Sequence, residues 1–358
     1  MSKVLLPTAS GTTEGYLLQP PADFPVADAA SIPRVAYAAA HVVSDPLAAI
    51  DPWEQNAIDW DATLAYRRHL AGLGLGIAEA MDTAQRGMGL DWTGALEVIR
   101  QTVSELPEAL VFSGAGTDHL QPEDAKTLSD VHRAYEEQIS AIQAVGGRVI
   151  LMSSRALAQI ASSPDHYVEA YRRALAICEK PVILHWLGEM FDPALQGYWG
   201  AESFPQCMET ALAVIAENVV KIDGIKISLL DAQKEIEMRR RLPDGVKMYT
   251  GDDFNYHELI AGDSKGFSHA LLGIFDPLAP LAARSLNMLT AGDIAGFRKT
   301  LDPTVPLARK IFEAPTQYYK TGVVFLAWLN GYQRHFVMLD GAQSARSLPY
   351  FADVFRMA

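Results

Sequence analysis

Short apolar runs alternate with longer amphipathic segments along most of this chain. Each run is almost continuously apolar, which is typical of parallel strands covered on both faces. The segments between the runs have helical spacing; in Pro164–Glu179, for example, the apolar residues form a single stripe. The eight runs are Val35–Ala40, Gly74–Ala78, Ala109–Ser113, Arg148–Met152, Pro181–Trp186, Ile222–Ile227, Val246–Tyr249 and Gly266–Ala270.

This alternation predicts a (β/α)8 TIM barrel, in which each parallel strand is followed by a helix. Among the intervening helices, two more are expected at Phe204–Asn218 and Asp231–Arg241. A doubly wound open sheet is the alternative fold. It usually has fewer strand–helix units, and no Gly-x-Gly-x-x-Gly motif follows the first strand here. The pattern therefore favours the barrel.

Two segments lie outside the barrel pattern. Residues 1–33 begin with two short apolar runs separated by a Ser/Gly/Thr-rich turn, which predicts a β-hairpin, and continue as a Pro- and Ala-rich connector. We expect the barrel over residues 34–276 and a C-terminal helical extension, packed on the barrel, over residues 277–358. The helices expected in that extension are Leu278–Leu289, Ile294–Glu313, Gln317–Asn330 and Tyr350–Phe355. The apolar side chains of Val323–Leu329 are expected to be core rather than an interface.

The composition narrows the classes of partner and location. The chain has 358 residues with a formal net charge of −13, a charge that repels nucleic acid and anionic membranes, so neither is an expected partner. Cys178 and Cys207 belong to no zinc motif or disulfide framework and are expected as buried free thiols. The first apolar run is too short for a signal peptide, and none reaches the ~18 residues of a membrane-spanning helix. These features predict a cytoplasmic protein.

Reactive groups of such barrels lie at the carboxyl ends of the strands. Lys226 lies in the apolar sequence DGIKISLL, where burial disfavours the charged amine, and a neutral amine is what attack on a carbonyl requires. A lysine that pairs with Asp252 or Asp253 and only supports the barrel is an equally open interpretation. His185, at the end of the run PVILHW, is a candidate proton relay or a hydrogen-bonded residue that shapes the pocket.

A metal site is the second interpretation of the strand ends. Imidazole and carboxylate ligands suit zinc, manganese or iron. Such a site predicts a divalent-metal-dependent sugar isomerase or epimerase, in which Lys226 is an acid–base or electrostatic group. The possible ligands are scattered over several strands without a local motif: His41, His185, Glu189, Asp253 and His269.

The last three predicted strands carry a resemblance to a known family. Residues 222–271 are similar to the corresponding region of the dihydrodipicolinate synthase and N-acetylneuraminate lyase family, in which a Gly-Ile-Lys strand carries a lysine that forms a Schiff base. The matching features, in order, are Gly224-Ile225-Lys226, Leu242-Pro243, Gly251-Asp252-Asp253 and Ser268. The resemblance implies a class I, imine-forming lyase, aldolase or dehydratase that needs no organic cofactor and assembles as a homodimer or homotetramer.

The chain departs from the family at other motifs, which indicates a divergent branch. The turn Met81–Gln85 resembles the family's Gly-Thr-Thr-Gly-Glu, whose hydroxyls bind the substrate carboxylate; Thr83 is kept, but Asp82 replaces a neutral residue. His185 stands where the family has a proton-relaying tyrosine. Arg155 is a candidate cation that compensates for the altered turn.

These features together predict the following chemistry. Lys226 attacks the carbonyl of a 2-oxo acid or sugar-derived keto acid, and His185 moves the proton. The residues expected to bind this small-molecule substrate are Thr83, Asp82, Ser268, Asp252, Asp253, His41 and Arg155. A barrel that binds a sugar acid without turnover is a third interpretation.

Overall fold

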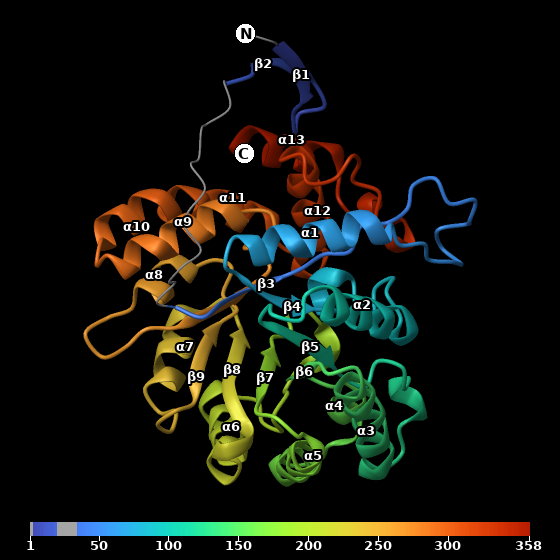
Figure 1. The fold of residues 1–358 in the computed structure, drawn as a ribbon, viewed down its shortest axis with the longest axis vertical. Helices are drawn as coiled ribbons and strands as arrows, with labels where there is room; N and C mark the ends of the chain where they lie inside the picture. Colours follow the sequence, from blue (N-terminus) through green and yellow to red (C-terminus); the bar gives the residue numbers. More distant parts are fainter. Residues whose placement is uncertain (1–2, 20–33) are drawn as a thin grey trace.

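The computed structural model describes residues 3–19 and 34–358; the predicted connector lies outside them. Eight parallel strands form a closed barrel in which β10 pairs with β3, and this confirms the predicted (β/α)8 fold. Figure 1 shows the strands surrounded by helices, with the C-terminal helices gathered at one end. The strands are β3 (Ala36–Ala39), β4 (Gly76–Glu79), β5 (Val111–Ala115), β6 (Arg148–Leu151), β7 (Val182–Leu187), β8 (Ile222–Ser228), β9 (Lys247–Thr250) and β10 (His269–Leu272).

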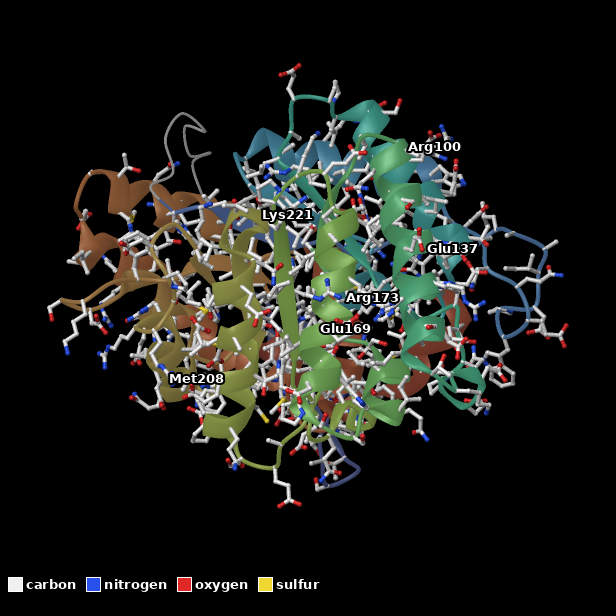
Figure 2. The ribbon with its side chains drawn as sticks, turned by 90° about the horizontal axis from the view of Figure 1, so that it is seen from below. Arg100, Glu137, Glu169, Arg173, Met208 and Lys221 are labelled. Atoms are coloured by element: carbon white, nitrogen blue, oxygen red, sulfur yellow. The ribbon has the colours of Figure 1, made fainter. Side chains whose placement is uncertain are left out.

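The helices between the strands form the outer layer of the barrel. They are α1 (Trp60–Gly72), α2 (Trp92–Glu105), α3 (Leu128–Ala144), α4 (Arg155–Ile160), α5 (Pro164–Ile177), α6 (Phe204–Glu217), α7 (Ala232–Arg239) and α8 (Tyr256–Ala261). Their apolar stripes pack against the sheet, and their outer faces carry charged side chains such as Glu169 and Arg173 (Figure 2). This is the amphipathic arrangement that the spacing predicts.

The last predicted strand begins later than expected. A turn in which the Asp263 amide donates to the Gly266 carbonyl oxygen at 2.8 Å occupies the start of the predicted run Gly266–Ala270. Gly266 has φ +151°, which interrupts the strand, so pairing starts only at His269. Ser268 and His269 consequently lie at the amino end of β10, not at its carboxyl end.

Aromatic and aliphatic side chains fill the interior of the barrel near its amino end. Tyr37, Phe112 and Tyr249 are fully buried there, and the Tyr37 ring meets the other two rings at centroid distances of 5.5 and 5.7 Å. Because these rings fill the amino end of the barrel, a ligand can reach groups inside it only from the carboxyl ends of the strands.

The C-terminal extension consists of α9 (Ala279–Thr290), α10 (Ile294–Leu301), α11 (Val305–Ile311), α12 (Tyr319–Leu329) and α13 (Leu348–Met357). The helix expected over Ile294–Glu313 is two helices, because Pro303 lacks an amide hydrogen and disfavours helical geometry in the residue before it. Helix α12 is buried over Tyr319–Ala327, which confirms the expected core position of most of Val323–Leu329.

The predicted hairpin is present and packs against the end of the chain. Strands β1 (Lys3–Pro7) and β2 (Thr13–Leu17) pair antiparallel. Tyr16 contacts Phe355 of α13 with ring centroids 5.9 Å apart, and the Arg356 guanidinium donates to the Pro7 carbonyl oxygen at 3.0 Å. Figure 1 shows the hairpin standing on α13, beyond the barrel. Within the described residues, no helix combines the length and apolar character needed to cross a membrane.

Candidate active site

Lys226 points into the barrel from β8, next to His185 on β7, with which it shares a register position. Only 7 % of its surface is exposed. Gly251, at the end of β9, makes room for it: a Cβ atom there would lie 2.7 Å from Cε of Lys226 and 2.3 Å from Oγ of Ser228. The side chain of Lys226 therefore occupies space that only a glycine at position 251 leaves open.

Burial lowers the pKa of Lys226, and the nearby carboxylates of Asp82 and Asp253 oppose that shift. Among residues 3–19 and 34–358, none forms a hydrogen bond or direct ion pair with its amine. The alternative in which Lys226 is paired with Asp252 or Asp253 is thus not realised as a contact. An amine that is buried and not held in an ion pair is suited to nucleophilic attack.

His185 is fully buried beside the lysine. Its Nε2 lies 3.2 Å from the Ser228 hydroxyl, and its Nδ1, which has no hydrogen-bond partner among the described residues, lies 3.9 Å from a carboxylate oxygen of Asp82. Burial, and then the charge of Lys226, hold the pKa of His185 well below its usual value. The ring is therefore neutral and has one free nitrogen for proton transfer.

The two adjacent aspartates that follow β9 have different roles. Asp253 lies near Lys226; it accepts a hydrogen bond from the Ile274 amide at 2.8 Å, and burial raises its pKa to about 7. Asp252 instead accepts hydrogen bonds from the Phe254 and Asn255 amides, at 2.9 and 3.0 Å, and so stabilises the turn. The structure therefore gives the predicted substrate contact of Asp252 no support.

Thr83 reaches the site, and its hydroxyl lies 2.8 Å from that of Tyr319. Tyr319 begins α12 in the C-terminal extension and is buried. Sequence reasoning missed Tyr319, because no local motif marks it. One of these two hydroxyls donates to the other, which leaves one hydroxyl hydrogen for a ligand.

Two spaces adjoin these residues. A cavity of about 730 Å3 is lined by residues that include His185, Ser153 and Arg155. A much smaller space of about 10 Å3 is lined by Lys226, Thr83, Asp253, Tyr319, Phe191 and others. Asp82 and Leu187 line both, so they stand where the large cavity meets the pocket of Lys226. Arg155 lies on the rim, 44 % exposed, with Nε 2.5 Å from an Asp192 carboxylate oxygen.

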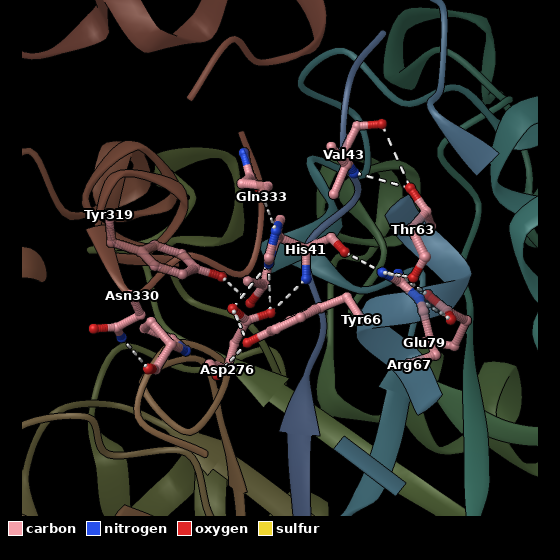
Figure 3. A network of polar contacts seen from close by, with 12 residues as sticks. His41, Val43, Thr63, Tyr66, Arg67, Glu79, Asp276, Tyr319, Asn330 and Gln333 are labelled. Atoms are coloured by element: carbon pink, nitrogen blue, oxygen red, sulfur yellow. Dashed lines mark hydrogen bonds and ion pairs between the residues drawn. The ribbon is translucent and has the colours of Figure 1, made fainter. Parts of the chain in front are cut away.

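Other predicted site residues lie elsewhere. His41 is fixed in a buried network (Figure 3): its Nδ1 lies 2.8 Å from the Asp276 carboxylate and its Nε2 lies 2.7 Å from the Gln333 amide oxygen. Both nitrogens are occupied, so the prediction that His41 binds substrate is not supported.

Ser268 and His269 are at the wrong end of the barrel. The Ser268 hydroxyl donates to Glu235 of α7 at 2.6 Å, and the Val35 amide donates to Nδ1 of His269 at 2.9 Å. The prediction of a Ser268 substrate contact was wrong because β10 starts later than expected.

The alternative metal ligands are not assembled. His41 and His269 are held as described, and Glu189 is exposed beyond β7 without lining either space. In the described part of the chain, no three His, Cys, Asp or Glu side chains are arranged to hold one ion. Cys178 and Cys207 are free and buried, as expected.

Comparison with solved structures supports the fold. The prophage protein YagE of the dihydrodipicolinic acid synthase family from Escherichia coli K12, solved in complex with pyruvate, aligns with a TM-score of 0.68 at 12 % identity over 92 % of this chain and 100 % of that one. Dihydrodipicolinate synthase DapA-2 from Bacillus anthracis gives 0.64 at 16 % identity over 88 % and 100 %. Dihydrodipicolinate synthase from Aquifex aeolicus gives 0.63 at 13 % over 84 % and 88 %. At these identities the likeness establishes the barrel fold alone.

The sequence itself matches one family. Residues 4–358 match the family described as "Protein of unknown function (DUF993)", and the chain belongs to it. A search of curated proteins found no match. The chain thus belongs to the DUF993 family and has the barrel fold seen in these dihydrodipicolinate synthase structures.

Proposed function

We propose that this protein is a class I lyase, aldolase or dehydratase that forms an imine between Lys226 and a small oxo compound. The observation that carries the proposal is the buried, unpaired amine of Lys226, which lies beside a neutral histidine. The small space that it lines shares Asp82 and Leu187 with the large cavity. The resemblance makes 2-oxo acids and sugar-derived keto acids the first compounds to test.

The residues around the lysine can supply the steps of this reaction. The neutral amine adds to the carbonyl carbon, and the amine proton passes to the carbonyl oxygen, which leaves as water after a second protonation. When a carbon–carbon bond breaks, the resulting iminium takes up the electron pair of that bond and an enamine forms. In loss of water, the iminium instead takes up the pair of the adjacent carbon–hydrogen bond as a base removes the proton, and the enamine then expels a protonated hydroxyl group, which leaves as water with the pair of the carbon–oxygen bond. Protonation of the enamine and hydrolysis of the imine then free the lysine.

His185 and Asp253 are the candidate proton carriers. His185 lies beside Lys226 with Nδ1 open, and Asp253 has its pKa raised to about 7 by burial, so it exchanges a proton near neutrality. Thr83 and Tyr319 offer a hydroxyl hydrogen to the polar end of the substrate. No organic cofactor enters this scheme.

The test is borohydride trapping, in which hydride reduces the imine to a stable secondary amine that mass spectrometry locates. We expect an adduct at Lys226 with at least one oxo compound, and none in the Lys226→Arg variant. Lys320 provides a matched control, because it is also buried and burial lowers its pKa to about 8. Lys320→Arg should trap normally. Binding of oxo compounds without any adduct would instead favour a non-catalytic binding barrel.

A further inference from the structure

We propose that the substrate is an uncharged, hydroxylated carbonyl compound rather than a 2-oxo acid, and that Asp82 selects it by accepting a hydrogen bond from a hydroxyl beside the carbonyl. This inference rests on the proposed imine at Lys226 and names the class of compound that forms it.

Asp82 stands where a substrate must pass to reach the lysine. It is the first residue of η1 (Asp82–Ala84), directly after β4, and it lines both the large cavity and the small space at Lys226. Among the described residues, its carboxylate makes no hydrogen bond, and its one ion-pair neighbour is the neutral His185 at 3.9 Å. The carboxylate is therefore free to accept from a ligand.

The charges around Lys226 do not favour a substrate carboxylate. In a 2-oxo acid the carboxylate carbon is bonded to the reacting carbon, so it must lie two bonds from Nζ once the imine forms. Asp82 and Asp253 are the acidic neighbours that act on the Lys226 amine. An iminium there has Asp82 as a counter-charge, and Asp253 as a second one whenever it is ionised, so a further carboxylate would face like charge.

The cations nearby are already engaged. The cavity of about 730 Å3 is lined by six carboxylates (Asp82, Asp91, Asp118, Glu137, Asp192 and Asp340) and by two arginines. All three guanidinium nitrogens of Arg86 donate hydrogen bonds, two of them to Asp118. Arg155 is paired with Asp192 at the rim. Lys320, which also acts on Asp82, lines neither space and donates to the Gln317 carbonyl oxygen at 3.0 Å.

A hydroxylated tail suits such a cavity, because ionised carboxylates only accept hydrogen bonds and hydroxyl groups can donate them. The hydroxyl pair of Thr83 and Tyr319 offers a single hydrogen toward the ligand, whereas a carboxylate needs several donors when no cation is free. These observations favour small hydroxyketones and simple sugars as the compounds that enter.

The experiment compares two probes that differ in one group: hydroxyacetone and pyruvate, which carry a hydroxymethyl and a carboxylate, respectively, on the same acetyl unit. Each is incubated with the full-length protein and borohydride, and the adduct at Lys226 is quantified by peptide mass spectrometry. The adduct yield with each probe is divided by the yield that the same probe gives with Nα-acetyl-lysine, whose side-chain amine is free. This ratio removes the difference in intrinsic reactivity between the two probes. We expect the adduct yield with hydroxyacetone to exceed that with pyruvate by about tenfold or more, since juxtaposed like charges repel each other.

Variants connect the preference to Asp82. Asp82→Asn and Asp82→Ser should lower the hydroxyacetone-to-pyruvate ratio by about tenfold, because each removes the repelling charge. The ratio is taken within one variant, so a partial loss of folded protein affects both probes equally. Glu237→Gln, on the exposed face of α7, makes the same change in net charge and should leave the ratio unchanged.

The outcomes separate the two proposals. If pyruvate labels Lys226 as well as hydroxyacetone does, or if both Asp82 variants keep the wild-type ratio, this inference is overturned while the imine function stands. If neither probe, nor any compound of the wider oxo panel, labels Lys226, the proposed function fails and this inference fails with it.

Discussion

The hydroxyl of Tyr319 lies 2.8 Å from the hydroxyl of Thr83, so the C-terminal extension completes the wall of the Lys226 pocket. Tyr319 belongs to α12, and Thr83 follows β4 near the start of the barrel. The Tyr319 ring also stacks on Phe312 at a centroid distance of 4.4 Å, which fixes its direction. The extension is therefore part of the site as well as of the core.

Replacement of Tyr319 by Phe should weaken both the fold and the site. A buried hydrogen bond contributes about 1 kcal/mol net, so we expect the free energy of unfolding to fall by roughly that amount. The imine-trapping rate at Lys226 should fall several-fold, because Thr83 loses its orienting partner. Chemical denaturation and timed trapping measure the two effects.

Tyr350→Phe is the matched control for this prediction. The Tyr350 hydroxyl is also contributed by the extension and donates to the Ile311 carbonyl oxygen at 3.0 Å, away from the pocket. Its loss should cost similar stability and leave trapping unchanged. Equal trapping in both variants would mean that Tyr319 only supports the fold.

Gly251→Ala should displace the lysine. The new Cβ would overlap Cε of Lys226 at 2.7 Å and Oγ of Ser228 at 2.3 Å. Overpacking of this kind typically costs about 1–3 kcal/mol, and we expect trapping at Lys226 to be largely lost. Gly72→Ala, at the end of α1 with no atom within 4 Å of its added Cβ, should trap as the wild type does. Normal trapping by Gly251→Ala would show that the lysine does not need this space.

Much of the fold and part of the site follow from the sequence. The spacing of apolar residues and the length of the apolar runs predict the barrel. The strand ends of such a barrel lie close together, so the sequence predicts a site that contains Lys226, His185, Asp82, Thr83 and Asp253. These residues do lie together in the structure. That inference needs only local patterns and the rule that parallel strands share an edge.

The remaining site residues depend on contacts that no local pattern encodes. Tyr319 comes from a distant helix, and His41 is held by Asp276 and Gln333, which are far from it in sequence. Ser268 was misplaced because an apolar run does not mark where pairing begins, and the turn before it moved the strand. Strand boundaries are the least reliable feature of such predictions.

The pH dependence of trapping should report the environment of Lys226. Burial lowers its folded pKa below the ordinary 10.5, so the neutral amine is present at lower pH than in an exposed lysine. With one carbonyl probe, the trapping rate should rise with pH and level off below pH 10.5. The unfolded lysine binds more protons than the folded one between the two pKa values, so this group makes the fold less stable as pH falls through that interval. A plateau only above 10.5 would contradict the prediction.

Glu235 should make the stability of the protein depend on pH in the opposite sense. It is buried on α7, where burial raises its pKa to about 8, and its Oε1 accepts from Ser268 at 2.6 Å. Its Oε2 has no hydrogen-bond partner among the described residues, so no donor stabilises a negative charge on that oxygen. Because the folded pKa lies above the unfolded value of 4.5, the stabilisation is complete below pH 4.5 and is lost as pH rises through about 8.

Glu235→Gln keeps the shape and cannot ionise, so its free energy of unfolding should change less than that of the wild type between about pH 5 and about pH 9. Urea denaturation at several pH values in this range measures the slope. Glu237→Gln, exposed on the same helix, should keep the wild-type slope. If Glu235→Gln also kept that slope, Glu235 would have to be ionised in the folded protein, and Arg239, which donates to the Ser268 hydroxyl at 3.3 Å, would be its most direct counter-charge.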